Sequence, residues 1–275
     1  MKKKALLTGV AFLLFAGLLN AHTLFIKLDT YFLKPHSSVT IALVNGTFDK
    51  SEGTIARRRM TDVSVVGPGD EVTHPDTSRW REQGTLTLLD LETDAPGTYV
   101  VGVSTAPNMI ALSAKDFNEY LEHDGVLDVL AARKRDGELD LDARERYSKH
   151  VKAVLQVGDR RTGAYGHRLG YPAEIVPVNN PYALGVGDTF EVLVLVDGRP
   201  VANQYVEASH EGYHGHDAAG EHRVAVRTRT DETGVARIPL EAAGRWYVKL
   251  IHMARVDDGE ADYESKWATL TFEVR

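Results

Sequence analysis

The stretch FEVLVLVDG, residues 190–198, decides the fold class of this chain. Every second residue from Phe190 to Val196 is apolar, and in an extended strand these residues fall on one face. Asp197 and Gly198, which follow directly, are a turn signal. The pattern predicts a strand of a β-sandwich.

The same pattern returns elsewhere in the chain. SVTIALVNG (38–46) has the same character and also ends in a turn signal, and APGTYVVGV (95–103) is echoed by AAGRWYVKLI (242–251). WATLTFEV (267–274) alternates in the same way and would close the last sheet. Both pairs recur at an offset of about 150 residues, so we expect two related immunoglobulin-like β-sandwich domains of roughly 100 residues each.

The period changes between these two sets of strands. Ser113 is a suitable N-cap, and Phe117, Tyr120 and Leu121 then repeat at helical spacing. This predicts a short helical insertion. The chain is therefore expected to be mainly β and to divide into a signal peptide (1–21), an N-terminal sandwich (22–112), a helical insertion (113–150), a strand and linker (151–175) and a C-terminal sandwich (176–275).

The first 21 residues, MKKKALLTGVAFLLFAGLLNA, are typical of a secretory signal peptide. Three lysines precede an apolar run of about 15 residues, which is shorter than the ~20 that a membrane-spanning helix needs. We expect cleavage after Ala21 and a periplasmic protein with no membrane span after processing.

Composition excludes several classes of function. The chain has 32 basic and 39 acidic side chains, and loss of Lys2, Lys3 and Lys4 leaves 29 against 39, a balance of −10. An acidic protein is not expected to bind nucleic acid. There is no cysteine, so no disulfide framework exists. The nucleophile, zinc-protease and nucleotide-binding motifs are missing as well, and we expect no enzymatic activity.

The stretch SHEGYHGHDAAGEH, residues 209–222, is dense in histidine. Neutral imidazole is the commonest metal ligand in proteins, and short His-rich tracts are typical of metal binding. The stretch therefore predicts a metal-collecting loop in the C-terminal domain, and its candidate ligands are His210, His214, His216 and His222.

Cleavage after Ala21 would make His22 the first residue, where an α-amine and an imidazole could chelate one metal ion through two nitrogens. Such a site suits nickel, cobalt or copper. A further ligand is needed, and His252, in the predicted strand WYVKLIHM, is our candidate, with His150 as the alternative. The other interpretation of His252 is a buried histidine bonded to a carbonyl group.

Longer motifs resemble a bacterial exported family of unknown function that is associated with nickel or cobalt uptake as a substrate-specific component. The resemblance covers nearly all of the chain after the signal peptide. It is carried by AHTLFIKLDTYFLKP, LVNGTF, FNEYLEHDGVLD, YSKHVKAVLQVGD, LGYPAEIVPVNNPYALGVGD, TDETGVARIPL and ESKWATLTFEV.

The resemblance implies a first histidine at His22, a His-rich loop before a TD-x-x-G turn, and a late His-Met pair. In this chain the turn is Thr230-Asp231 with Gly234, and the pair is His252 with Met253. Two departures are that Thr23 stands where an aspartate often follows the first histidine, and that the loop holds fewer histidines than in some members.

Together these features predict a periplasmic protein that captures nickel or cobalt and delivers it to a membrane transporter. A copper-binding oxidase, holding its metal through an N-terminal histidine, is one alternative. A structural or adhesive sandwich protein with incidental histidines is the other.

Overall fold

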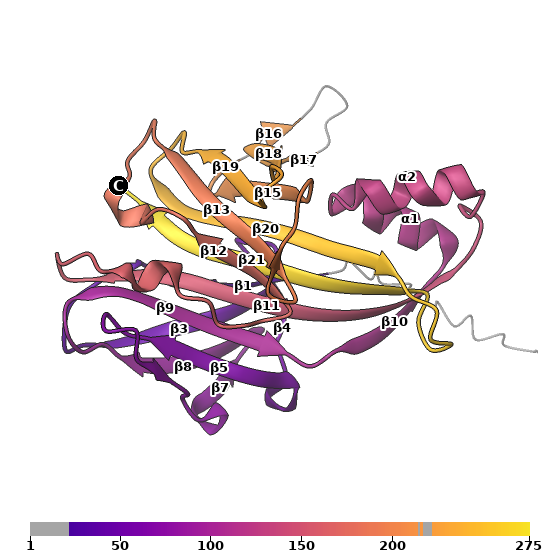
Figure 1. The fold of residues 1–275 in the computed structure, drawn as a ribbon. Helices are drawn as coiled ribbons and strands as arrows, with labels where there is room; N and C mark the ends of the chain where they lie inside the picture. The colour runs from indigo at the N-terminus through magenta and orange to yellow at the C-terminus, as the bar shows by residue number, and fades with distance from the viewer. Residues whose placement is uncertain (1–21, 214, 217–221) are drawn as a thin grey trace, which may run out of the picture.

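Figure 1 shows the chain in a computed structural model, which describes residues 22–213, 215–216 and 222–275. The predicted signal peptide, residues 1–21, and the loop histidine His214 lie outside the described residues. Within the part that is described, neither α-helix combines the length and the apolar composition that crossing a bilayer requires.

Three sheets and a two-stranded ribbon make up most of the fold. The first sheet has the order β1 (Thr23–Lys27), β3 (Ser38–Gly46), β8 (Leu86–Glu92) and β7 (Trp80–Gln83), with β4 (Ser51–Gly53) paired to β3. The third sheet holds β12 (Ala173–Pro177), β13 (Thr189–Val196), β14 (Arg199–Pro200) and β19 (Val235–Pro239). The ribbon is β16 (Gly215–His216) with β17 (His222–Arg223).

The second sheet, called the central sheet below, has ten strands. Its order is β18 (Val226–Arg229), β15 (Tyr205–His210), β20 (Gly244–Arg255), β21 (Tyr263–Val274), β11 (Ala143–Val157), β9 (Gly97–Thr105), β5 (Met60–Val66) and β6 (Val72–Thr73). Two further strands, β2 (Phe32–Leu33) and β10 (Asn108–Leu112), pair with β11. The parallel pairing of β11 with β21 joins strands from the two halves of the chain into this one sheet.

The central sheet carries one neighbouring sheet on each face (Figure 1). On one face, the Thr269 hydroxyl of β21 donates a hydrogen bond to the Leu24 carbonyl of β1 over 2.8 Å. On the other face, the Phe272 ring of β21 lies 4.5 Å from the Phe190 ring of β13. Successive side chains of a strand point to opposite faces, so β21 packs on the first sheet with one set and on the third sheet with the other.

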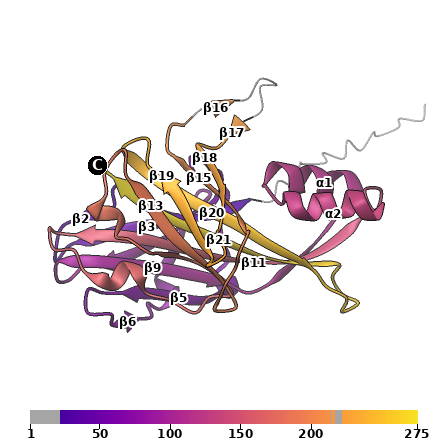
Figure 2. The same ribbon diagram turned by 45° about the horizontal axis from the view of Figure 1, so that its top comes forward.

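Two short helices, α1 (Ala114–His123) and α2 (Leu127–Asp136), lie side by side at one end of the central sheet (Figures 1 and 2). The Ser113 side chain accepts a hydrogen bond from the Asp116 amide and caps α1. The buried face of α1 packs on the central sheet, where the Tyr120 ring stacks on the Trp267 ring at 5.8 Å.

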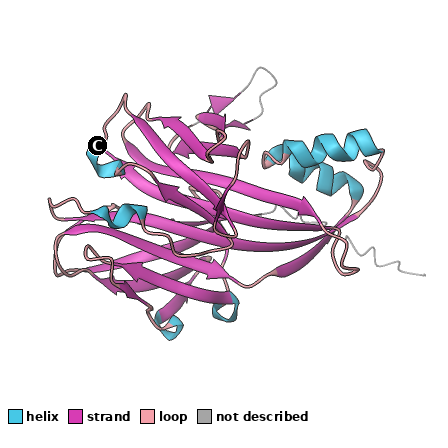
Figure 3. Cartoon of the chain, viewed as in Figure 1, coloured by secondary structure: helices cyan, strands magenta, loops and turns pink. Residues whose placement is uncertain are grey.

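The mainly β prediction is confirmed, and the coloured cartoon shows how little of the chain is helical (Figure 3). Both pairs of similar segments form strands: β3 and β13 are the first pair, and β9 and β20 are the second. The helical insertion is shorter than expected, because residues 143–150 belong to strand β11 instead of a helix. Most of β11 is buried on both faces, and three of its buried residues are Lys149, His150 and Lys152. Its sequence therefore does not alternate between apolar and polar residues. The remaining segments include the 3-10 turns η1 (Arg57–Arg59), η2 (Thr77–Arg79), η3 (Gly163–Gly166) and η4 (Pro181–Ala183).

Candidate functional site

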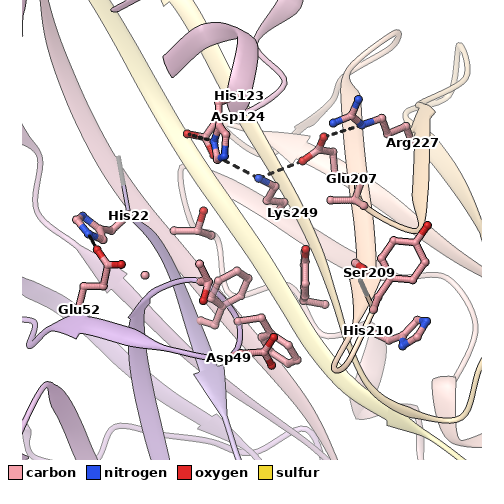
Figure 4. Close-up of a pocket in the computed structure, with 18 residues that line it drawn as sticks. His22, Asp49, Glu52, His123, Asp124, Glu207, Ser209, His210, Arg227 and Lys249 are labelled. Atoms are coloured by element: carbon pink, nitrogen blue, oxygen red, sulfur yellow. Dashed lines mark hydrogen bonds and ion pairs between the residues drawn. The ribbon is translucent and has the colours of Figure 1, made fainter. Parts of the chain in front are cut away.

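A cavity of about 250 Å³ opens on the face of the central sheet that also carries the first sheet and the helices. It lies where the start of β1, the turn between β3 and β4, the end of α1 and the β15–β20 pair meet (Figure 4). Tyr213, within the His-rich stretch, and Val224, just after it, also line the cavity. Residues far apart in the sequence therefore share one cavity.

His22 stands at one side of this cavity, directly before β1 (Figure 4). Its ring nitrogen Nε2 lies in close hydrogen-bonding contact with Oε2 of Glu52 in β4. The β1–β3 ladder begins at Thr23, which pairs with Gly46, so His22 is the first residue outside the sheet. The side chains of His22 and Glu52 are 29% and 40% exposed, which leaves both accessible from solvent.

The side chain of Lys149 binds the main chain of His22. Its Nζ donates hydrogen bonds to the His22 carbonyl oxygen and, over 3.1 Å, to Oδ1 of Asn45. The ammonium also lies 5.6 Å from the ring centres of both Tyr147 and Trp267. Burial, and then the nearby Arg59 charge, lower the pKa of Lys149 to about 7.

A row of alternating charges forms another wall of the cavity (Figure 4). Lys249 Nζ lies 3.3 Å from Oδ1 of Asp124 and 3.0 Å from Oε2 of Glu207. Arg227 Nε lies 3.1 Å from Oε1 of Glu207, an ion pair without hydrogen-bond geometry, so this buried oxygen has no hydrogen-bond donor among the described residues. The row fastens the end of α1 to the β15–β20 pair.

The pKa shifts of Lys249 and Asp124 both favour the charged form. Burial lowers the pKa of Lys249, but the Glu207 and Asp124 carboxylates outweigh it and raise that pKa above its ordinary value. Burial likewise raises the pKa of Asp124, yet Lys249 outweighs it and the pKa lies below the ordinary value. The Asp124 carboxylate, 3.7 Å from Nδ1 of His123, raises the pKa of His123.

The histidines of the His-rich stretch divide into two groups. His210 lies at the rim of the cavity, on the opposite side from His22, and its ring packs 4.9 Å from the Trp246 ring while Nδ1 lies 3.1 Å from the Glu211 carbonyl oxygen (Figure 4). His216 pairs with His222 across the β16–β17 ribbon. No group of three or more histidine and carboxylate side chains arranged to hold a metal ion occurs within the described part of the chain.

The structure does not bring His252, the expected partner of His22, into this cavity. His252 lies in β20 as predicted, but three residues beyond Lys249, and strand alternation therefore places it on the opposite face from the cavity. There its Nδ1 lies 2.9 Å from Oε1 of Gln204. Burial, and then the Lys266 charge, lower the pKa of His252.

His150, the alternative ligand, also faces away from the cavity. It follows Lys149 in β11, and its two ring nitrogens each lie 2.9 Å from a hydroxyl oxygen, those of Ser104 and Ser148. Burial, followed by the Lys266 charge, lowers the pKa of His150 to about 4. It is a neutral, buried histidine of the sheet interior.

Sequence reasoning missed several residues of the cavity. His123 belongs to no recognisable ligand pattern in the sequence, and its side chain is 77% exposed, but it lines the cavity. Glu52 could not be recognised from the sequence, because it lies in a three-residue strand that is too short to show a periodic pattern. Lys149 and Lys249 could have been found from one feature, a lysine within an otherwise apolar strand, since such a lysine needs a specific polar partner when it is buried.

Comparisons with known proteins give a family and distant structural likenesses. The sequence profile of a family described as a domain of unknown function, DUF4198, matches residues 19–254. No curated protein sequence matches the chain. An Escherichia coli alpha-2-macroglobulin activated by porcine elastase is 12% identical, with a TM-score of 0.27 over 92% of this chain and 20% of that chain. The Yersinia pseudotuberculosis adhesin InvE is 11% identical, with a TM-score of 0.22 over 92% of this chain and 58% of that chain. The chain thus spans about a fifth of the macroglobulin's length.

Proposed function

The chain belongs to the family described as a domain of unknown function, DUF4198, and we propose that this member is a periplasmic protein that binds a transition-metal ion. Nickel or cobalt is the proposed cargo, with copper as a third ion that the same nitrogen ligands would accept. The protein would pass its metal to a membrane transporter and would itself catalyse no reaction.

The observation that supports this proposal is the shared cavity. His22 with its partner Glu52 lines this cavity, and so do His210 and Tyr213 from the described part of the His-rich stretch. We therefore propose that the His-rich stretch collects the metal ion and passes it to His22. Histidine and carboxylate side chains are suitable ligands for these metals, and the acidic balance of the chain favours a cation.

The proposal includes the expected processing and domain division. Cleavage after Ala21 would give His22 a free α-amine, which supplies a second nitrogen ligand. We interpret residues 22–112 and 176–275 as two immunoglobulin-like domains, so that His22 comes from the first domain and the His-rich loop from the second. A carrier must release its cargo, and the partly exposed side chain of His22 leaves a bound ion accessible for transfer.

The test is calorimetric titration of the protein purified from the periplasm, after its first residue has been determined. Nickel, cobalt and copper salts are added to the wild type, to a variant with His210, His214, His216 and His222 changed to alanine, and to His22→Ala. His36→Ala is the matched control, because His36 is exposed and pairs with Asp94 outside the cavity. We expect weaker binding or lower stoichiometry in the first two variants and no change in the control.

Full stoichiometry and affinity in the loop variant would show that the loop is only a polar hairpin. The same result in His22→Ala would show that the first histidine is incidental. Correctly processed wild-type protein that binds none of the three metals would overturn the proposal and leave a structural or adhesive protein. Oxidation of a test substrate by the copper-loaded protein would instead indicate an oxidase.

A further inference from the structure

We propose that Glu52 and Lys149 are positioning residues that present two nitrogen atoms of His22, the α-nitrogen and Nδ1, to the metal ion. The inference rests on the proposed function and deepens it, because it names the donor atoms and the groups that orient them.

The imidazole ring of His22 is held by one nitrogen only. Nε2 contacts the Glu52 carboxylate, and an ionised carboxylate accepts a hydrogen bond, so Nε2 carries the proton and Nδ1 keeps its lone pair. Nδ1 has no hydrogen-bond partner among the residues that the structure describes. A carboxylate on the second nitrogen is the usual partner of a metal-bound histidine, since it fixes both the tautomer and the ring orientation.

The free nitrogen is the one that chelation needs. An α-amine and Nδ1 of the same histidine close a six-membered ring with a metal ion, through Cα, Cβ and Cγ, whereas Nε2 lies on the far side of the imidazole and cannot take part. Because Glu52 occupies Nε2, the contact selects Nδ1 as the donor. Glu52 is therefore assigned to orienting the ring and not to binding the metal.

The main chain of His22 is held by Lys149. The ammonium binds the His22 carbonyl oxygen on one side of Cα, and the ladder that begins at Thr23 fixes the next residue. The α-nitrogen, on the other side of Cα, lies outside this ladder. With the carbonyl and the ring both held, the α-nitrogen and Nδ1 are ordered before a metal arrives, which lowers the entropic cost of binding.

A lysine at position 149 is unfavourable for the stability of the fold. We infer that its value lies in the contact with His22. Lys149 is only 6% exposed and lies within ion-pair distance of no carboxylate among the described residues. Lys152, on the opposite face of the same strand, is equally buried but pairs with Glu174 at 2.8 Å. The sequence thus pairs one buried lysine of β11 with a carboxylate and directs the other to the carbonyl of His22.

The experiment uses processed protein that begins at His22, with Lys149→Met and Glu52→Gln as variants and Lys152→Met as the control. Copper sulfate is the probe, because Cu²⁺ bound by nitrogen gives an electron paramagnetic resonance signal that counts nitrogen donors. We expect Cu²⁺ affinity to fall about 10- to 100-fold in Lys149→Met and Glu52→Gln. Lys152→Met should lose stability and keep the wild-type affinity, because it disturbs the other face of the sheet.

A second measurement needs no metal. Nitrogen chemical shifts of the His22 ring in the metal-free protein should show the proton on Nε2 in the wild type and a mixture of tautomers in Glu52→Gln. Wild-type affinity in both Lys149→Met and Glu52→Gln, or coordination through Nε2, would overturn the inference while leaving the proposed function intact. A wild-type protein that binds no metal would overturn the proposed function, and with it the role of the two residues toward a metal.

Discussion

Replacing Lys149 by methionine should make the fold more stable near neutral pH, although it removes hydrogen bonds. Burial lowers the pKa of this lysine from 10.5 to about 7. Each pKa unit corresponds to about 1.4 kcal/mol, so the buried ammonium costs on the order of 5 kcal/mol at pH 7 and below. Methionine fills a similar volume between the rings of Tyr147 and Trp267 without a charge.

The lost hydrogen bonds offset part of this gain. The His22 carbonyl and Asn45 each lose a donor, which costs about 1–3 kcal/mol in all, since His22 is partly exposed and can bind water instead. A net gain of about 2–4 kcal/mol in the free energy of unfolding is therefore expected at pH 7. The Lys149→Met variant would then bind metal less tightly than the wild type but have a larger free energy of unfolding.

The pH dependence has a definite sign. Between about pH 7 and pH 10.5 the unfolded chain keeps the Lys149 proton that the folded chain has released, so wild-type stability rises with pH by up to about 1.4 kcal/mol per unit. The variant has no such group. Its advantage over the wild type should thus be largest at and below pH 7 and should shrink as the pH rises.

The assay is urea unfolding of the metal-free wild type and variant across this pH range, followed by tryptophan fluorescence. The two proteins can be compared where the free energy of unfolding falls with urea concentration at the same slope in both. Metal must be removed first, because a bound ion would add its own stabilisation to the wild type. A variant that is less stable at every pH, or a difference that does not change with pH, would refute the reasoning.

Other substitutions test the packing and the metal site. Lys152→Met should cost about 3–5 kcal/mol in urea unfolding, because it leaves the buried Glu174 carboxylate without its counter-charge, and a second change, Glu174→Gln, which removes the charge and keeps an oxygen acceptor for the Leu169 amide, should recover much of that loss. Gly125→Ala should cost about 1–3 kcal/mol, since Gly125 has a φ of +76° and an added Cβ would lie 2.6 Å from the Tyr205 ring; an unchanged unfolding midpoint would contradict this. Phe272→Ala should cost about 3–5 kcal/mol by removing a fully buried ring, and a loss below about 1 kcal/mol would show that the two sheets repack easily. Nickel affinity of the processed wild type should fall when the pH drops below about 6, because histidine must lose its proton to coordinate a metal, and calorimetry at two pH values measures it.

The sequence predicted strands best where one face is buried and the other is not. In β13, Phe190 and Val192 are fully buried and Glu191 between them is half-buried, so the alternation survives in the sequence. In β11 the burial extends to both faces, and no alternation remains to be found. The helices were recognised from Ser113 and the spacing of Phe117 and Tyr120, but the end of the helical insertion was placed too late because the first part of β11, residues 143–150, was not recognised as strand.

The candidate site was predicted only as far as the residue types allowed. His22 and the His-rich stretch stand out by composition, and the cavity joins both. The sequence could not show that His252 points away from the cavity, because the face to which a strand residue points depends on register, and the register of β20 against β15 is fixed by residues far away in the chain. Neither Glu52 nor Lys149 shows in the sequence that it contacts His22, because both contacts form only through the tertiary fold.

The parallel pairing of β11 with β21 also determines when the chain can finish folding. Strand β21 follows both β11 and β20 in the sequence, yet it lies between them in the middle of the central sheet. Before β21 has paired, the long edge of β11 has no partner on that side and is free to pair with other chains. Contacts between such distant segments form slowly, so completion of the central sheet depends on β21, and deletion of this strand would leave β11 and β20 without the strand that joins them.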